Sequence, residues 1–291
     1  MFKRLCIIGV GLIGGSIARA ARQHGLCQEI VGLGPKQHED ELIIATRLGV
    51  VDRYYTDAAS ALAGADCVII ATPVGAVQSV FEQLAPFWNN STIYSDACST
   101  KASVVIAAQT VFGSVPVNFV PAHPVAGAER SGAAASSAEL FSNRRLIITP
   151  LADTDARAVA VIQRFWQKIG STVSMMTVEH HDTVLAATSH LPHILAFALV
   201  GLLGRKDEQR EIFKYAAGGF KDFSRIASSD PTMWLDICIA NKQELIPLLQ
   251  QYREELQHIE HLLADEQSQQ IFETFAYARN ARQRFLDQLE D

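Results

Sequence analysis

Gly9-Val10-Gly11-Leu12-Ile13-Gly14 is the stretch that decides the fold of the first half of this chain. A short apolar run at residues 4–8 precedes it, and residues 12–24 continue with apolar positions at helical spacing. The pattern predicts a strand, a tight turn and a helix. In a GxGxxG turn the glycines permit the sharp bend, the close approach of a pyrophosphate and close packing of helix on strand. The residues predicted to bind a dinucleotide are therefore Gly9, Gly11, Leu12, Ile13 and Gly14.

Further short apolar runs follow this unit along the chain, separated by segments long enough for helices. Buried strands that alternate with helices predict a parallel sheet covered on both faces. A turn of this kind at the first strand makes the expected sheet a Rossmann-type sheet. The runs lie at residues 30–33, 67–71, 92–95, 118–120 and 145–148.

After Pro150 the pattern changes from strands to helices. Residues 153–169 predict a helix and residues 171–175 a last strand, after which apolar residues recur only at helical intervals. The expected fold is α/β: a Rossmann-type dinucleotide-binding domain at residues 1–176, then an all-α substrate-binding and dimerisation domain at residues 177–291. The later helices are expected at residues 178–203, 207–217, 229–264 and 267–289.

Residues 183–204 contain no Asp, Glu, Lys or Arg, and their strongly polar groups lie within Ser189-His190-Leu191-Pro192-His193. A buried imidazole costs free energy unless something binds it, so this segment is expected to form part of a ligand site. A helix that is apolar on several sides also predicts a homodimer. The alternative is a membrane span, which the two His, the Ser and the Pro make the weaker interpretation.

Charge and cysteine content narrow the possible partners. The formal net charge of -6 argues against nucleic acid, which needs clustered Lys and Arg. The five cysteines are scattered and form no CxxC pair, which argues against a disulfide framework and a zinc site and favours a reducing cytoplasm. The apolar run after Met1 is broken by glycines, so it is interpreted as mature structure and not as a signal peptide.

The predicted second strand ends without the Asp or Glu that would hold the ribose hydroxyls of NAD. Gly34 stands there, and Lys36 nearby could receive a 2'-phosphate, so acceptance of NADP is expected while NAD stays open. A second part of the cofactor site is expected where the strand at residues 67–71 ends, because open parallel sheets bind ligands at that edge. Its residues are Ala71, Thr72 and Pro73.

Two further loops follow predicted strands, at residues 96–101 (DACSTK) and 122–127 (AHPVAG). Together with GVGLIGGS at the start, SHLPH at residues 189–193, FKDFSRIA at 220–227 and DPTMW at 230–234, their order closely resembles the prephenate and arogenate dehydrogenase family. The resemblance covers nearly the whole chain. Each motif alone is unremarkable, whereas all of them together, in this order and spacing, are specific.

The resemblance implies an oxidative decarboxylation in tyrosine biosynthesis, from prephenate to 4-hydroxyphenylpyruvate with hydride transfer to NAD(P)+. The alternatives are an arogenate dehydrogenase that forms tyrosine directly and a dual-specificity cyclohexadienyl dehydrogenase. Ala128 and Glu129 stand where the substrate side chain could be recognised, and they leave this choice open. The chain has no room for the chorismate mutase or regulatory domain of some relatives, so feedback control by tyrosine through such a domain is not expected. A competitive effect of tyrosine at the active site stays open.

The resemblance also implies roles for single residues. His123 matches the catalytic histidine, and a neutral imidazole can accept a proton near pH 7. Ser99 matches a serine that hydrogen-bonds this histidine and the substrate hydroxyl and borders the cofactor; capping of the following helix is its other interpretation. Arg225 matches an arginine whose planar fork holds a carboxylate. The remaining expected site residues are His193 in contact with substrate, His190 as a hydrogen-bonded support, Trp234 as an apolar neighbour of Arg225, and Asp222 as an orienting group for the guanidinium.

Two readings from other classes remain. A hydroxyacid dehydrogenase would use a lysine of the helical domain as its base, and Lys221 and Lys242 are available. A non-catalytic dinucleotide sensor would need only the glycine-rich turn. Both leave the SHLPH segment and His123 without a function.

Overall fold

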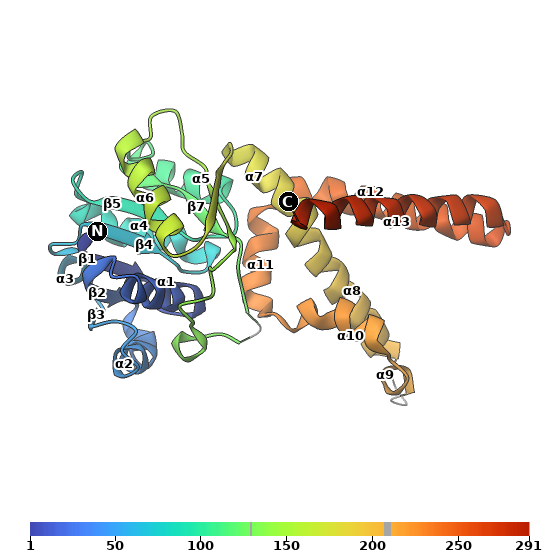
Figure 1. Ribbon diagram of the computed structural model, residues 1–291, viewed down its shortest axis with the longest axis horizontal. Coiled ribbons are helices and arrows are strands. Elements are labelled where there is room, and N and C mark those ends of the chain that lie inside the picture. Colours follow the sequence, from blue (N-terminus) through green and yellow to red (C-terminus); the bar gives the residue numbers. More distant parts are fainter. Residues whose placement is uncertain (129, 207–210, 291) are drawn as a thin grey trace. The chain divides into compact units, whose positions relative to one another are not determined.

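The computed structural model describes residues 1–128, 130–206 and 211–290 (Figure 1). The chain divides into two compact units, Met1–Lys242 and Gln243–Asp291. The first unit contains a parallel sheet of six strands in the order β3-β2-β1-β4-β5-β6, the strand order of dinucleotide-binding folds. The predicted Rossmann-type domain is therefore confirmed. The strands are β1 (Phe2–Ile8), β2 (Cys27–Leu33), β3 (Arg53–Tyr55), β4 (Cys67–Ile70), β5 (Ile93–Asp96) and β6 (Phe119–Val120).

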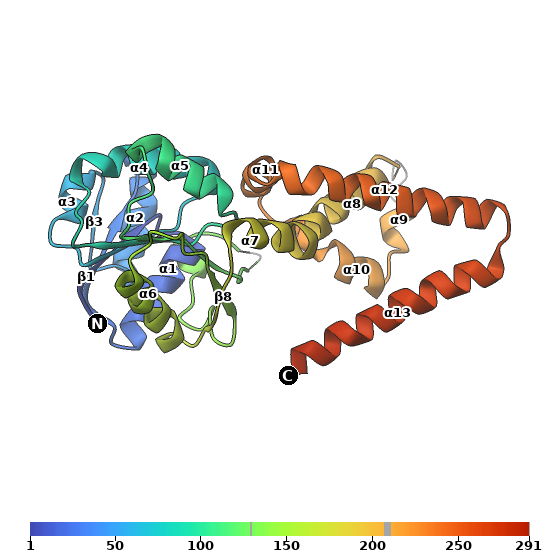
Figure 2. The same ribbon diagram turned by 90° about the horizontal axis from the view of Figure 1, so that it is seen from above.

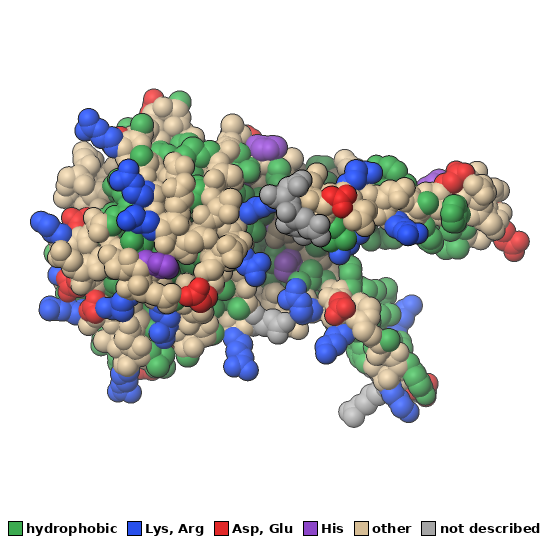
Figure 3. Space-filling view, viewed as in Figure 1, with side chains coloured by type: hydrophobic (Ala, Val, Ile, Leu, Met, Phe, Trp, Pro, Cys, Tyr) green, Lys and Arg blue, Asp and Glu red, His purple; other side chains and the backbone are tan. Residues whose placement is uncertain are grey.

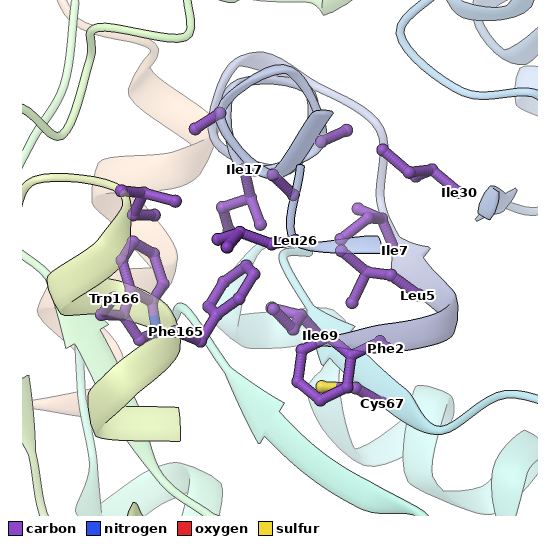
Figure 4. Close-up of a cluster of buried hydrophobic side chains, with 14 of the residues drawn as sticks. Phe2, Leu5, Ile7, Ile17, Leu26, Ile30, Cys67, Ile69, Phe165 and Trp166 are labelled. Atoms are coloured by element: carbon purple, nitrogen blue, oxygen red, sulfur yellow. The ribbon is translucent and has the colours of Figure 1, made fainter. Parts of the chain in front are cut away.

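Helices cover both faces of this sheet because successive side chains of its central strands are apolar and point to opposite faces. Leu5 and Ile7 of β1 join one buried cluster, shown in Figure 4, while Cys6 and Ile8 join the other. Figure 2 shows α1 (Leu12–Gln23) and α6 (Ala156–Lys168) on one side of the sheet. The helices on the other side are α3 (Ala58–Leu62), α4 (Val77–Leu84) and α5 (Ala102–Phe112).

Not all predicted strands belong to the parallel sheet. Residues 122–124, expected as a loop, form β7 (Ala122–Pro124), which pairs antiparallel with β8 (Arg145–Ile148), and β8 pairs parallel with β9 (Thr172–Met175). Pro121 has no N–H to donate, so β6 ends after two residues and the chain changes sheets there. Membership of the parallel sheet was therefore the wrong expectation for residues 145–148, and the last predicted strand, at residues 171–175, also joins the smaller sheet. The predictions also missed β3, a strand of three residues without an apolar run.

The charge-free segment forms one nearly continuous helical stretch with a widened turn in the middle. α7 (Val178–Leu185) leads into a π-helical segment, η5 (Ala186–His190), and then α8 (Leu191–Lys206). Pro192 cannot donate the hydrogen bond that a regular helix would direct to Thr188, which explains a wider turn immediately before it. The expected regular helix at residues 178–203 is thus interrupted.

Shorter helices complete the first unit. Of the helix expected at residues 207–217, residues 207–210 lie outside the described residues, and the rest contains only α9 (Glu211–Lys214). The remaining helices and turns of the unit are α2 (Glu39–Arg47), α10 (Gly218–Ser224), α11 (Pro231–Ala240), η1 (Lys36–His38), η2 (Val74–Ala76), η3 (Ala85–Phe87), η4 (Ala133–Ala135) and η6 (Arg225–Ser228).

The second unit is a pair of long helices, α12 (Lys242–Ala264) and α13 (Ser268–Glu290), joined by a short turn. The helix expected at residues 229–264 is therefore two helices, because α11 ends before Asn241 and α12 begins after it. Asn241 is buried, and its side-chain amide donates a hydrogen bond to the Asp182 carbonyl. That tertiary contact accounts for a break that local periodicity does not show.

Candidate active site

The glycine-rich turn has the geometry that a dinucleotide needs. Gly9 has a φ of +86°, which favours glycine, and a Cβ at Gly14 would lie 2.0 Å from the Gly9 carbonyl oxygen. By contrast, a Cβ at Gly11 would meet nothing within 4 Å, so this side of the turn opens toward space. Gly11 is also the residue before α1, and the described first turn of that helix carries no acidic side chain. The turn therefore fits a pyrophosphate held by the N–H groups and partial positive charge of the helix.

The turn after β4 lies against the glycine-rich turn. A Cβ at Gly9 would lie 2.8 Å from the Ala71 carbonyl oxygen and 3.0 Å from a methyl group of Thr72. Within the described part of the chain the buried Thr72 hydroxyl has no hydrogen-bond partner. A buried hydroxyl is usually satisfied, so this one is available to a ligand. Pro73 directly precedes η2, and the three residues predicted from this turn thus border the glycine-rich site.

At the end of β2 the structure pairs the predicted phosphate contact with an acid. The Lys36 ammonium donates to the Glu39 carboxylate, and this hydrogen bond raises the pKa of Lys36. Gly34 packs near Leu42, since a Cβ there would lie 3.2 Å from it. The carboxylate of Glu39 therefore partly offsets the positive charge of Lys36.

The loop after β5 is anchored by a buried ion pair. The Lys101 ammonium and the Asp96 carboxylate are both fully buried and bonded to each other. Lys101 also donates to the Ala122 carbonyl oxygen at 2.7 Å, and Asp96 accepts from the Ala122 N–H at 3.0 Å. Removing one partner of such a pair leaves an uncompensated charge and costs about 3–5 kcal/mol. The pair fixes the start of β7, which carries His123, against the loop of Ser99.

Ser99 lies in this loop, three residues before α5, and is half-buried. It does not cap the helix, because α5 begins after Lys101 and its first N–H groups are taken by another residue: the Asp182 carboxylate accepts from Lys101 N and Ala102 N, both at 2.8 Å. Among the described residues the Ser99 hydroxyl has no hydrogen bond, so the expected bond to His123 is absent.

His123 is instead hydrogen-bonded to a second histidine. Its Nδ1 lies 2.8 Å from Nε2 of His181, whose Nδ1 lies 2.7 Å from the Asp182 carboxylate. All three side chains are buried. Within the described residues this is the side-chain hydrogen bond that His123 makes, so its Nε2 remains available to a substrate.

Burial keeps these imidazoles neutral. It lowers the pKa of His123 well below 6.5, and the neighbouring His181 and the positive charge of Lys101 act in the same direction. Burial likewise lowers the pKa of His181 and outweighs the opposing hydrogen bond to Asp182. A base works only when it is unprotonated, that is above its pKa. His123 therefore satisfies this condition at neutral pH and loses it only as the pH falls well below 6.5.

His190 and His193 of the charge-free segment meet on Trp234. The His193 ring stacks on the Trp234 ring with centroids 3.6 Å apart, and the His190 ring meets it edge-on at 6.1 Å. Asn241 Nδ2 lies 3.0 Å from His190 Nδ1, and burial lowers the pKa of His190 to about 4. His193 donates from Nδ1 to the Ser189 carbonyl oxygen at 2.9 Å, which directs its Nε2 lone pair away from the helix.

Arg225 begins η6 and is exposed. Segment η6 packs against α8, the helix that carries His193. Burial lowers the pKa of His193, and the positive charge of Arg225 lowers it further. Asp222 is exposed near the end of α10. Arg225 is thus close to the predicted substrate contact His193, while the orienting role of Asp222 stays a prediction.

Helix α11 connects the two predicted parts of the site. It carries Trp234, and its Asp236 carboxylate accepts from the Gly75 N–H of the cofactor turn at 3.2 Å. A Cβ at Gly75 would lie 2.6 Å from that carboxylate, so only glycine permits the contact. The turn after β4 and the aromatic platform of Trp234 are therefore held together by one helix.

The structure thus brings His123, His190, His193 and Trp234 into one network. Glu129, expected to influence substrate choice, lies outside the described residues, and the adjoining Ala128 is exposed. Sequence reasoning missed several polar residues of the network, although His181 and Asp182 directly precede the charge-free segment and could have been suspected. The missed residues are Asp96, Lys101, His181, Asp182, Asp236 and Asn241.

Fold and site define the chain as an oxidoreductase with a dinucleotide-binding domain followed by a helical part. Two family models match it: "Prephenate dehydrogenase, nucleotide-binding domain" at residues 17–175, and "Prephenate dehydrogenase, dimerization domain" at residues 177–277. The chain belongs to the prephenate dehydrogenase family.

Two named relatives and one solved structure agree with this family assignment. A cyclohexadienyl dehydrogenase of Zymomonas mobilis is 36% identical over 97% of this chain and 96% of its own length. A prephenate dehydrogenase of Bacillus subtilis is 35% identical over 97% of this chain and 76% of its own. A prephenate dehydrogenase of Aquifex aeolicus, solved in complex with hydroxyphenyl propionate and NAD+, superimposes with a TM-score of 0.90 at 31% identity, covering 98% of this chain and 99% of that one.

Proposed function

We propose that this enzyme converts prephenate to 4-hydroxyphenylpyruvate and carbon dioxide in tyrosine biosynthesis, with NAD(P)+ as the oxidant. The observation that carries the proposal is His123, a buried imidazole whose Nε2 is unoccupied among the described residues. Its strand β7 is held against the loop of Ser99 through Lys101 and Asp96. The reaction needs one proton acceptor for the substrate hydroxyl, and His123 meets that need.

The proposed mechanism assigns one task to each side chain. Nε2 of His123 takes the hydroxyl proton as the ring is oxidised and returns it to the ring oxygen after the carboxylate has left, so the histidine ends neutral. The Ser99 hydroxyl orients the substrate hydroxyl. Arg225 binds a substrate carboxylate. His193 in α8, whose ring stacks on Trp234, contacts the substrate as well.

The bound cofactor would lie along the glycine-rich turn and the turn after β4. Gly11 and the N-terminus of α1 would hold the pyrophosphate, and the unpartnered Thr72 hydroxyl would contact the nucleotide. NAD(P)+ supplies the hydride acceptor for the ring carbon that bears the hydroxyl.

Arogenate is the second candidate substrate, since one relative is a cyclohexadienyl dehydrogenase, a name that fits either ring compound. The test is a four-way assay of nicotinamide reduction with prephenate and arogenate, each with NAD+ and NADP+. Turnover of prephenate supports the first proposal, and turnover of arogenate alone would replace it. A hydroxyacid dehydrogenase would turn over neither, and the lysines that it would use, Lys221 and Lys242, are both exposed.

For the cofactor we propose that NAD+ is bound and that NADP+ is also accepted, because no acid stands at Gly34 and Lys36 is near. The Lys36→Ala variant is expected to raise the KM for NADP+ about tenfold and to leave the KM for NAD+ nearly unchanged, since only NADP+ has the 2'-phosphate. Glu39→Gln is the matched variant: it frees Lys36 and is expected to improve NADP+ binding. Equal effects of Lys36→Ala on both cofactors would contradict the proposal.

We also propose that residues 177–291 form the helical substrate-binding domain and join two chains in a cytoplasmic homodimer. In α8, all of whose residues are described, only Ala196 is buried, and Figure 3 shows hydrophobic side chains along this region. In α13, Phe272 and Phe275 are 67% and 56% exposed. The stretch from Val178 to Lys206 is long and apolar enough to cross a membrane, and a subunit interface explains that apolar surface equally well.

Light scattering after size exclusion is expected to give twice the 31.8 kDa chain mass in solution without detergent. Phe275→Glu should raise the dimer dissociation constant by roughly 10²-fold or more, because each large apolar side chain is repeated by symmetry. Arg284→Gln, a polar change on the opposite side of the same helix, should not raise it. A single-chain mass for the unmodified protein would contradict the dimer, and extraction only with detergent would favour the membrane reading.

A further inference from the structure

Three buried side chains form a hydrogen-bonded series that ends at the proposed base. The Asp182 carboxylate bonds Nδ1 of His181 at 2.7 Å, and Nε2 of His181 bonds Nδ1 of His123 at 2.8 Å. The three residues are 3%, 0% and 7% exposed, so water does not compete for these bonds. Neither His181 nor Asp182 has a role in the reaction as described above.

The ionised carboxylate of Asp182 determines which ring nitrogens of His181 and His123 carry protons. Asp182 accepts three hydrogen bonds, from His181, Lys101 N and Ala102 N; burial raises its pKa, but these bonds outweigh burial and leave the pKa lowered. An ionised carboxylate only accepts, so Nδ1 of His181 carries a proton. A neutral His181 then has its lone pair on Nε2, which must accept from His123. The proton of His123 therefore lies on Nδ1, and its lone pair lies on Nε2.

We propose that His181 and Asp182 are positioning residues that fix His123 in the tautomer able to accept a proton at Nε2. The proposal rests on His123 being the base of the proposed function. Without the acceptor at His181, the His123 proton could occupy either ring nitrogen, and the Nε2–H form cannot take the substrate proton. Once Nε2 has accepted that proton, the Nδ1–H of His123 continues to donate to His181, which stabilises the cation.

The surroundings of His181 disfavour its protonated form, which would invert the tautomer of His123. If His181 were an imidazolium, its Nε2 would donate to His123 and the tautomer of His123 would be inverted. Burial and the positive charge of Lys101 lower the pKa of His181, and so disfavour the imidazolium. Asp182 and Asp96 raise that pKa, but the pKa remains lowered. His190 also lies near His123, and it is neutral because burial lowers the pKa of His190 to about 4.

Asp182 also aligns the base with the loop of Ser99. Besides holding His181, its two oxygens cap α5 by accepting from Lys101 N and Ala102 N. The loop that carries Ser99 and the imidazole that carries the base are therefore positioned by one carboxylate. A shift of that carboxylate would displace the hydroxyl and the base together, and misplacement of reacting groups by about 1 Å can cost roughly 10²-fold in rate.

Substitution of His181 tests the proposal, with its exposed neighbour His180 as the matched control. His181→Phe keeps a planar ring but removes the acceptor, and it is expected to lower kcat by roughly 10²-fold with little change in KM. His181→Gln offers an amide oxygen to Nδ1 of His123 and should recover part of the loss. His180→Phe should leave kcat unchanged, since His180 lies on the exposed side of α7.

Nitrogen NMR of the full chain labelled with ¹⁵N-histidine measures the tautomer of His123 directly. A purely structural role of His181 would leave that tautomer unchanged. In the unmodified protein without substrate, His123 is expected to have a protonated Nδ1 and an unprotonated Nε2; its signals are assigned by their loss in His123→Asn. In His181→Phe both tautomers should appear. Asp182→Asn, if it folds, should shift the proton toward Nε2, because an amide can donate to His181.

An unmodified protein whose His123 carries its proton on Nε2 would overturn the proposal, and so would a His181→Phe variant with unchanged kcat. The NMR measurement needs no substrate. If neither prephenate nor arogenate were turned over, the proposed function would fail while the tautomer of His123 could still be read.

Discussion

The His123→Asn variant is expected to lose roughly 10²-fold or more in kcat while the KM for prephenate changes little. Asparagine can still donate to Nε2 of His181, but it has no nitrogen lone pair to accept the hydroxyl proton. The loss therefore falls on the step in which the proton moves and not on binding. Steady-state kinetics with saturating NAD+ and varied prephenate measure the two constants separately.

An exposed histidine provides the control for this substitution. His258→Asn, in α12, changes the same chemical group away from the network and should leave kcat as it is. Thermal unfolding should show that His123→Asn is folded, because the buried ion pair of Lys101 and Asp96 that fixes β7 is untouched. Turnover of the folded variant at the rate of the unmodified enzyme would remove His123 from its proposed role.

The Arg225→Ala variant is expected to raise the KM for prephenate by roughly 10²-fold, with a smaller effect on kcat. A hydrogen bond to a charged group contributes about 1.5–3 kcal/mol, and a planar guanidinium can form two with one carboxylate. Because the carboxylate is bound both before and during the reaction, its loss weakens ground-state and transition-state binding together. Initial rates over a wide range of prephenate concentrations give the change in KM.

One further variant separates the charge of Arg225 from its shape, and a second variant at another arginine is the control. Arg225→Lys keeps a positive charge without the planar fork, so its KM should lie between those of the unmodified enzyme and the alanine variant. Arg157→Ala removes an exposed arginine at the start of α6 and should have no effect. An unchanged KM in Arg225→Ala would show that this residue does not bind substrate.

The nucleotide-binding sheet was largely predictable because its information is local. Residues 145–148 form a strand with the predicted bounds, and the other predicted strands are correct to within three residues at either end. Short runs of apolar residues reflect burial on both faces of a sheet, and each run can be recognised by itself. The change of sheet after Pro121 was not recognised, because strand pairing is decided between segments that are distant in the sequence.

The helical part was predictable in type but not in detail. Apolar periodicity indicates helices, yet it does not show the widened turn before Pro192 or the break at Asn241. Both interruptions depend on single hydrogen bonds. At Pro192 a bond of the regular helix is missing because proline has no N–H. At Asn241 the buried side-chain amide donates to the Asp182 carbonyl oxygen.

For the active site, the sequence indicated the residues that we propose to contact substrate and cofactor, and the tertiary structure showed which residues hold them in place. The glycine-rich turn, His123 and His193 belong to short motifs, so pattern and resemblance are enough to single them out. His181 and Asp182 could not be recognised in this way, because their hydrogen-bond partners, His123 and Lys101, lie 58 and 81 residues away in the sequence. A local pattern reports what a segment buries, whereas the protonation state of a buried base depends on every group that folding places beside it.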